Sequence, residues 1–144
     1  MNDINLATPV NACLRQPVPW PVSWHRVFPG EASQVGEARR FLAGCLADCA
    51  VADDAMTCVS ELAANAVLHS NSRLPGGSFT VKAGRDAGGR LRVEVADQGG
   101  PWEPSPDPGG QHGRGLVIVA RLAADWGITG HLDSRTAWLE LDWQ

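Results

Sequence analysis

The sequence lacks a block of basic residues and any long apolar run. Its formal net charge is −4, so a nucleic-acid backbone would meet no cluster of positive charge. No stretch of about 18 apolar residues occurs, which argues against a membrane-spanning helix. Residues 1–16 also lack the basic segment and apolar run of a signal peptide. We therefore expect a cytoplasmic protein that binds neither nucleic acid nor membrane.

Length and composition favour a single domain. The 144 residues are 44% hydrophobic and 19% charged, which suffices for one hydrophobic core but hardly for two. Residues 1–22 include four prolines and show no sustained apolar periodicity, so we predict a flexible or extended arm there. We expect residues 23–144 to form the folded domain.

The spacing of apolar residues predicts helices and strands. Steps of three and four residues indicate amphipathic helices, whereas strict alternation indicates half-buried strands. Because helices and strands do not alternate as in βαβ units, we expect an α/β (α+β) two-layer sandwich, with helices on one face of a mixed, mainly antiparallel sheet. The predicted helices run from Ser33 to Cys49, from Asp53 or Asp54 to His69, and from Gly113 or Gly115 to Ala124. The predicted strands cover residues 23–28, 79–83, 91–95, 125–129 and 135–143.

The four cysteines are expected to be reduced thiols, and Cys45 and Cys49 are expected to pack in the core. Cys45 and Cys49 share a predicted helical face with Leu42, which suits small apolar residues. A structural zinc site would need four ligands in paired spacings, and the sequence has no such pattern. We therefore expect no metal at the cysteines.

Glu61, Asn65 and His69 follow one another at intervals of four residues. On a helix such positions are offset by about 40° each, so the three side chains can face one cleft. The amide oxygen of Asn65 can ligate Mg²⁺, which takes only one or two protein oxygens alongside phosphates and water. Glu61 would lie where an incoming hydroxyl needs a base. Taken alone, the same pattern also fits a solvated polar helix face.

Asp97 stands where an alternating strand breaks into glycines. It continues the inward-facing set formed by residues 91, 93 and 95. A carboxylate there can accept a hydrogen bond from the exocyclic amine of adenine, and Gly99 would let the backbone approach the ring closely. An ordinary turn aspartate is the alternative interpretation, because aspartate is common after strands.

A glycine-rich segment, residues 109–116, opens the last predicted helix. Its bare N–H groups and the helix dipole form an anion site. The segment is not a Walker loop, because it lacks the Gly-Lys-Ser/Thr ending, and it lacks the spacing of a dinucleotide fingerprint. Before it, residues 99–112 hold four prolines and four glycines, a composition typical of a lid or binding loop.

In this order and spacing, the three motifs resemble the N box and the two glycine boxes of the GHKL superfamily, which includes gyrase, the heat-shock chaperone ATPase, mismatch-repair ATPases and histidine kinases. Within it, the chain is most similar to the small stand-alone anti-sigma-factor serine/threonine kinases of bacteria. The resemblance covers residues 23–144. It implies the histidine kinase-like ATPase (Bergerat) fold, with ATP and Mg²⁺ as cofactors.

The resemblance also implies a role for each motif residue. It makes Asn65 the Mg²⁺ ligand and Glu61 the catalytic base. Asp97 would contact adenine, Gly99 would let the base lie flat, and Thr136 on the last strand would place a hydroxyl near the base. The residues implied at the phosphates are Gly113, Arg114, Gly115 and Leu116.

Two positions depart from the family pattern. The first glycine box usually reads Asp-x-Gly-x-Gly, but Pro101 occupies the place of its last glycine. Thr136 has the opposite strand parity to Ala137, Leu139 and Leu141. It therefore reaches the core only if the strand bulges or twists at that point.

The resemblance implies an ATP-dependent serine/threonine protein kinase in bacterial transcription regulation. It would phosphorylate an anti-anti-sigma protein, and it would sequester a sigma factor when that antagonist is phosphorylated; a homodimer is one candidate assembly. The alternative is an ATP-gated regulatory binding module, in which nucleotide orders the lid and exposes a partner surface without phosphoryl transfer. Glu61 favours the enzyme, because nucleotide binding alone needs no base beside the γ-phosphate.

Overall fold

The computed structural model describes residues 22–100, 111–131 and 133–142. The predicted arm, apart from its last residue, and residues 101–110 of the predicted lid lie outside these ranges. The described helices are α2 (Gln34–Cys45), α3 (Ala52–His69) and α4 (Gln111–Leu122), together with the short 3₁₀ helix η2 (Asn71–Arg73). The described strands are β1 (Val22–Pro29), β2 (Ser78–Arg85), β3 (Arg90–Asp97), β4 (Asp125–His131) and β5 (Ser134–Asp142).

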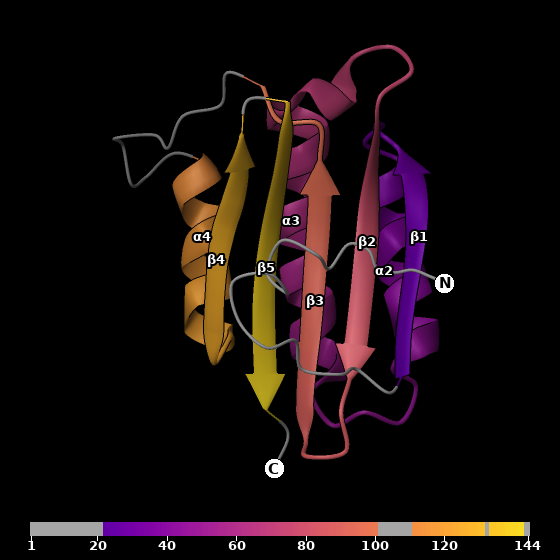
Figure 1. Ribbon diagram of the computed structural model, residues 1–144, viewed down its shortest axis with the longest axis vertical. Helices are drawn as coiled ribbons and strands as arrows, with labels where there is room; N and C mark the ends of the chain where they lie inside the picture. Colours follow the sequence, from indigo (N-terminus) through magenta and orange to yellow (C-terminus); the bar gives the residue numbers. More distant parts are fainter. Residues whose placement is uncertain (1–21, 101–110, 132, 143–144) are drawn as a thin grey trace.

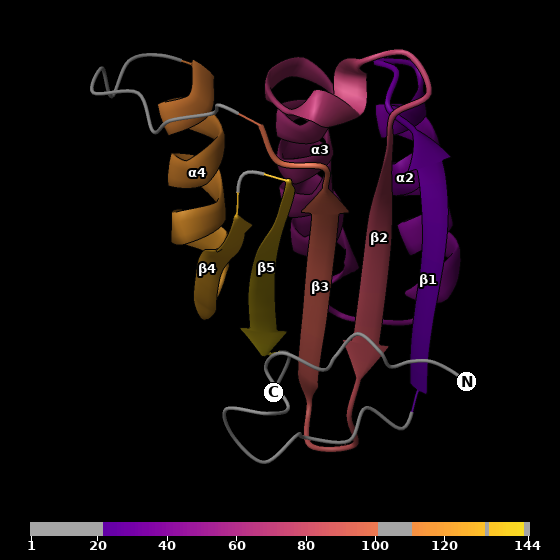
Figure 2. The same cartoon turned by 45° about the horizontal axis from the view of Figure 1, so that its top comes forward.

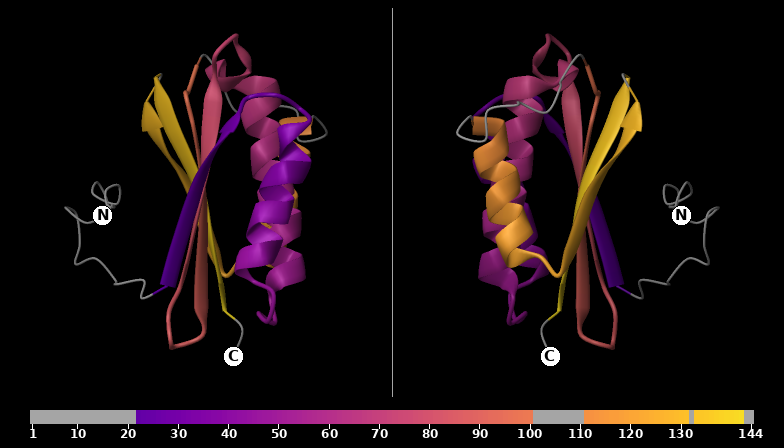
Figure 3. Two further views of the ribbon diagram at one scale, coloured as in Figure 1. Left: turned by 90° about the vertical axis from the view of Figure 1, so that its right-hand side faces the viewer. Right: turned by 90° about the vertical axis from the view of Figure 1, so that its left-hand side faces the viewer.

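The strands and helices form two layers. The sheet has the order β1-β2-β3-β5-β4, and each neighbouring pair is antiparallel. All three α-helices cover the same face of this sheet, with α3 between α2 and α4 (Figures 1 and 3). The predicted two-layer sandwich is therefore confirmed, and the described sheet is antiparallel throughout. None of the helices in the described ranges is long and apolar enough to span a membrane.

The hydrophobic core fills the space between the two layers. Phe28 of β1 and Phe79 of β2 stack with their ring centroids 5.4 Å apart, and Phe41 of α2 meets Phe28 edge-on at 5.9 Å. Alternate residues of the strands point toward the helices, as the sequence pattern predicts. The buried residues of α3 are Ala55, Cys58, Val59, Leu62, Ala63, Ala66 and Val67. This central helix is therefore fixed along its length by the core.

The first helix is shorter than predicted. Ser33 is its N-cap residue but makes no side-chain capping hydrogen bond. The helix ends at Cys45, and Cys49 lies buried in the turn that follows. The apolar spacing continues through this turn because the chain still packs on the same core, so the spacing does not mark the break. Cys49 packs in the core and Cys45 against it, as predicted, and Cys58 also lies in the core; Cys13 lies outside the described residues.

The other two helices begin earlier than predicted. Val51 is the N-cap residue of α3, so Asp53 and Asp54 lie in the first turn rather than at the cap. There their negative charges face the positive end of the helix dipole. Helix α4 begins at Gln111, two residues before Gly113. Its glycines therefore lie inside the first turns of the helix instead of preceding it.

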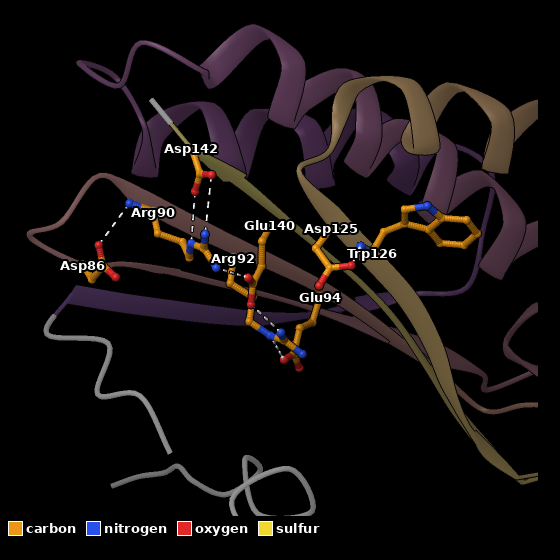
Figure 4. Close-up of polar contacts among 8 residues, drawn as sticks. All are labelled: Asp86, Arg90, Arg92, Glu94, Asp125, Trp126, Glu140 and Asp142. Carbon is orange, nitrogen blue, oxygen red and sulfur yellow. Dashed lines mark hydrogen bonds and ion pairs between the residues drawn. The ribbon is translucent and has the colours of Figure 1, made fainter. Parts of the chain in front are cut away.

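Charged side chains cover part of the sheet face that points away from the helices (Figure 4). Arg92 of β3 donates hydrogen bonds to Glu94 at 2.7 Å and to Glu140 of β5 at 2.8 Å. The Arg92 guanidinium also lies 4.4 Å from the ring centroid of Trp138. Arg90 donates to the other carboxylate oxygen of Glu140 at 2.8 Å. Arg92 is therefore the centre of a cross-strand network that links β3 to β5.

We expect Arg92→Ala to lower the free energy of unfolding by about 1–3 kcal/mol, because Glu94 loses its hydrogen bond from Arg92 and Glu140 keeps only Arg90, in a poorly solvated place. The side chain of Arg92 is 14% exposed, and that of Arg90 is 46% exposed. Arg90→Ala is the matched control, and it should cost less than about 1 kcal/mol, as exposed ion pairs do. Urea unfolding measures both values. An equal loss in the two variants would contradict this reading of the network.

Candidate functional site

One end of the sandwich gathers the three motifs found in the sequence. Strand β3 ends there at Asp97, α3 ends there at His69, and β5 begins there. The first turn of α4 lies at the same end (Figures 1 and 2). Segments that lie far apart along the chain therefore meet at one end of the sheet.

Asp97 is held from two sides at this end. Its Oδ1 accepts a hydrogen bond from the Gly99 N–H at 2.7 Å, and its Oδ2 accepts from Arg135 Nη2 at 2.9 Å and Nε at 3.3 Å. The side chains of Asp97 and Arg135 are only 8% and 12% exposed. Burial raises the pKa of Asp97, whereas the Gly99 N–H and Arg135 act in the opposite direction. The carboxylate is thus an oriented acceptor with little access to water.

The glycine turn that follows β3 is fastened to the segment after α3. The Asn71 N–H donates to the Gly99 carbonyl at 2.7 Å, and the Gln98 N–H donates to Ser72 Oγ at 3.0 Å. Gly100 has a φ of +125°, and a Cβ there would lie 3.0 Å from Asn71 Oδ1. These contacts hold the second motif against the end of the helix that carries the first.

Two serines form the buried polar part of this junction. Ser70 and Ser72 are both 0% exposed. Ser70 Oγ donates to the Ala66 carbonyl at 2.7 Å and accepts from the Ser72 N–H at 3.0 Å. Because the hydroxyl groups of both serines have hydrogen-bond partners, the burial of this turn carries no large desolvation cost.

Glu61 and Asn65 lie on α3, and both are half-buried. Their spacing of four residues brings the two side chains to the same flank of the helix. Glu61 borders a shallow hollow of about 400 Å³, and Asn65 does not. The other residues that line this hollow are Arg39, Asp53, Met56, Thr57 and Ser60. A molecule that approaches α3 from solvent at this hollow therefore reaches Glu61.

Cys58 lies three residues before Glu61 and is fully buried. Burial raises the pKa of its thiol to about 11, and the negative charges of Asp54 and Glu61 add to the effect. Such a thiol is protonated at neutral pH and is a poor nucleophile. Cys58 is therefore not a candidate nucleophile beside Glu61.

The residues predicted at the phosphates belong to α4. The backbone of Gly113, Arg114 and Gly115 lies in its first turns, and Leu116 is half-buried. In a helix that begins at Gln111, the N–H groups of residues 111–113 have no acceptor within the helix. The N–H of Gly113 is therefore among those without an acceptor in the helix, whereas the N–H groups of Gly115 and Leu116 have acceptors one turn earlier.

The structure corrects the expected position of Thr136. The ladder between β3 and β5 runs without a break from Arg90 opposite Asp142 to Asp97 opposite Arg135. With no bulge in this ladder, Thr136 keeps its outward parity and faces away from the helices. The residue that faces Asp97 is Arg135, and we therefore leave Thr136 out of the site.

The sequence patterns did not reveal Arg135 or the buried serines. Arg135 has the inward parity of Leu139, and a charge at such a position requires a partner. That signal indicates an ion pair but does not identify Asp97, which lies 38 residues away. Ser70 and Ser72 follow a helix, where serines commonly occur in exposed turns, so nothing in the sequence marks them as buried.

The fold and the site together indicate a class of protein, the histidine kinase-like ATPases. The features that indicate it are an antiparallel sheet with helices on one face, a carboxylate at the end of β3 and a glycine turn beside it. Residues 28–142 match the family model of the histidine kinase-like ATPase domain. The chain therefore belongs to this family, as the motif resemblance predicts. Among curated proteins, the comparison finds no match.

A solved structure shows the same fold. The chain is similar to the crystal structure of the RsbU and RsbW domains of Rv1364c from Mycobacterium tuberculosis, with a TM-score of 0.68 and 22% sequence identity. The match covers 89% of this chain and 33% of that chain. The match thus spans about a third of the length of that solved chain, and the likeness concerns the fold.

Proposed function

We propose that this protein is an ATP-dependent serine/threonine kinase and anti-sigma factor. The observation that carries the proposal is the pair Glu61 and Asn65 on one flank of α3, combined with the oriented carboxylate of Asp97 in the strand end fastened to that helix. Membership of the histidine kinase-like ATPase family supports nucleotide binding. The resemblance of the motifs to small anti-sigma kinases supports the finer class.

The residues at this end of the sandwich fit an adenine nucleotide with Mg²⁺. Oδ1 of Asp97 accepts the Gly99 N–H, and a carboxylate oxygen accepts two hydrogen bonds, so the exocyclic amine of adenine can be the second donor. The N–H groups at the start of α4, including that of Gly113, suit phosphate oxygens. Asn65 offers a neutral oxygen to Mg²⁺, which supplies charge stabilisation at the transferred phosphoryl group.

Glu61 has the role of general base in this proposal. A serine or threonine hydroxyl of the substrate forms a new O–P bond to the γ-phosphorus of ATP, and the bond from that phosphorus to the bridging oxygen of ADP breaks. The hydroxyl proton passes to the Glu61 carboxylate. The shallow hollow beside Glu61 gives the substrate side chain a route to this base.

The proposed partners follow from the resemblance of the motifs to anti-sigma kinases. The substrate is an anti-anti-sigma protein, and the protein holds a sigma factor when that antagonist is phosphorylated. We place this activity in the cytoplasm of a bacterium, with a homodimer as a candidate assembly. The alternative is an ATP-gated binding module without phosphoryl transfer. The half-buried carboxylate of Glu61, one helical turn before the proposed metal ligand, favours the kinase.

Calorimetry with MgATP tests nucleotide binding. We expect the wild-type protein to bind, and we expect Asp97→Ala to weaken binding about tenfold or more, because a charge-assisted hydrogen bond to adenine is lost. Asn65→Ala should weaken binding only when Mg²⁺ is present. Asp142→Ala is the control, since it removes a paired carboxylate at the opposite end of β5. A folded wild-type protein that binds no ATP would refute the proposal.

A further inference from the structure

Arg135 is a charged residue on the helix-facing side of the sheet. Its register position opposite Asp97, and the parity it shares with the buried Leu139 and Leu141, place it there. A nearly buried ion pair is poor support for stability, because hydrophobic residues of similar volume often stabilise a fold as well or better. The position of Arg135 beside the proposed nucleotide site therefore calls for a role beyond holding the sheet together.

The contacts show what Arg135 does to Asp97. Two guanidinium nitrogens donate to the single oxygen Oδ2, at 2.9 and 3.3 Å, while Oδ1 receives the Gly99 N–H. These three hydrogen bonds fix the plane of the carboxylate and use one of the two acceptor positions of Oδ1. Arg135 also opposes the effect of burial, which raises the pKa of Asp97. The carboxylate is therefore held in one orientation, and its ion pair with Arg135 favours the charged form.

We propose that Arg135 is a positioning residue that makes the nucleotide site selective for adenine. This inference rests on the proposed function. Adenine presents an N–H donor at the position where guanine presents the O6 acceptor. A fixed, ionised carboxylate accepts from the amine of adenine, and it repels the carbonyl oxygen of guanine. Without Arg135, the Asp97 side chain can rotate or bind a proton, and a protonated carboxyl can donate to O6.

Binding of three nucleotides measures this selectivity: ATP, GTP, and purine riboside triphosphate, which lacks the exocyclic amine. We expect the wild-type protein to prefer ATP over each of the other two by roughly 10- to 100-fold, the range for one charge-assisted hydrogen bond. In Arg135→Met both preferences should fall to about threefold or less. Arg135→Lys keeps the charge without the planar fork, so it should restore part of each preference.

Arg92→Ala is the matched control. Arg92 is 14% exposed and is paired with two carboxylates of the same sheet, on its opposite face. This variant should keep both wild-type preferences, even though its stability is reduced. A general loss of stability would therefore change melting temperatures in both variants, whereas loss of positioning changes nucleotide preference only at Arg135.

The outcomes separate the two proposals. If the wild-type protein prefers ATP and a folded Arg135→Met variant prefers it equally, the role of Arg135 is refuted and the proposed function stands. If the wild-type protein binds no nucleotide, both proposals fail. If Arg135→Met does not fold, Arg135→Lys decides: unchanged preferences overturn the inference, and preferences reduced about threefold or more support it.

Discussion

Glu61→Gln is expected to reduce phosphoryl transfer from ATP about 10²- to 10⁴-fold, the usual range for the loss of general-base help. Glutamine keeps the size and much of the hydrogen bonding of the side chain but removes the basic oxygen. Affinity for MgATP should stay within about threefold, because Asn65 and Asp97 are unchanged. Radiolabelled transfer from ATP to the antagonist protein co-purified from the native host measures the first quantity, and calorimetry measures the second.

Asp54→Asn is the matched control for Glu61→Gln. Asp54 is an exposed carboxylate two turns earlier on the same helix, and both carboxylates act on the thiol of Cys58. The control should transfer phosphate at the wild-type rate. Equal transfer by wild type and Glu61→Gln would remove Glu61 from the mechanism. If neither protein transfers phosphate but both bind the partner in an ATP-dependent manner, the binding module is the correct function.

Gly30→Ala is expected to lower the free energy of unfolding by about 3 kcal/mol, the upper part of the usual range for overpacking. A Cβ at residue 30 would lie 1.7 Å from the carbonyl oxygen of Ser72. That oxygen belongs to the backbone of η2, so a rotamer change cannot relieve the overlap. The N–H of Gly30 also donates to the Gly77 carbonyl at 3.0 Å, which limits movement of β1. Urea unfolding measures the loss.

Gly44→Ala is the control for the effect of adding a methyl group. Gly44 is exposed in α2, and a Cβ there would meet nothing within 4 Å. Alanine in place of glycine in a helix should raise stability by up to about 1 kcal/mol. The two substitutions are chemically identical, so opposite signs of their effects would show that the contact with Ser72 is responsible. A neutral Gly30→Ala would argue against that contact.

Local patterns predicted the elements well where one short segment determines its own structure. The β2–β3 hairpin follows from alternation on both sides of Asp86, whose carboxylate accepts from the N–H groups of Gly88 and Arg90. The helical interval between Glu61 and Asn65 likewise predicted their common flank. Pairing between distant strands has no such local signal. The position of β5 beside β3, and hence the partner of Asp97, therefore required the three-dimensional structure.

The site predicted from the sequence was wrong at one strand position. The motif resemblance pointed to Thr136, while the alternation of the strand pointed one residue away. In an unbroken ladder the side chains alternate strictly, so a shift of one residue moves a side chain to the other face. The alternation of the strand correctly predicted the orientation of Thr136, because β3 and β5 pair without a bulge. Ser72 is buried beside Gln98, whose N–H it accepts, and beside Gly30. These contacts join distant segments, so local sequence patterns could not predict the burial of Ser72.

The place of β5 in the sheet has a consequence for the nascent chain. Strand β5 follows β4 along the sequence, yet it lies between β3 and β4. Until β5 has been synthesised, one edge of β3 has no neighbouring strand, and such an unpaired edge can bind chaperones or aggregate. In the same interval Asp97 lacks Arg135, which arrives with β5. The arrival of β5 therefore completes both the sheet and the proposed adenine acceptor in a single step.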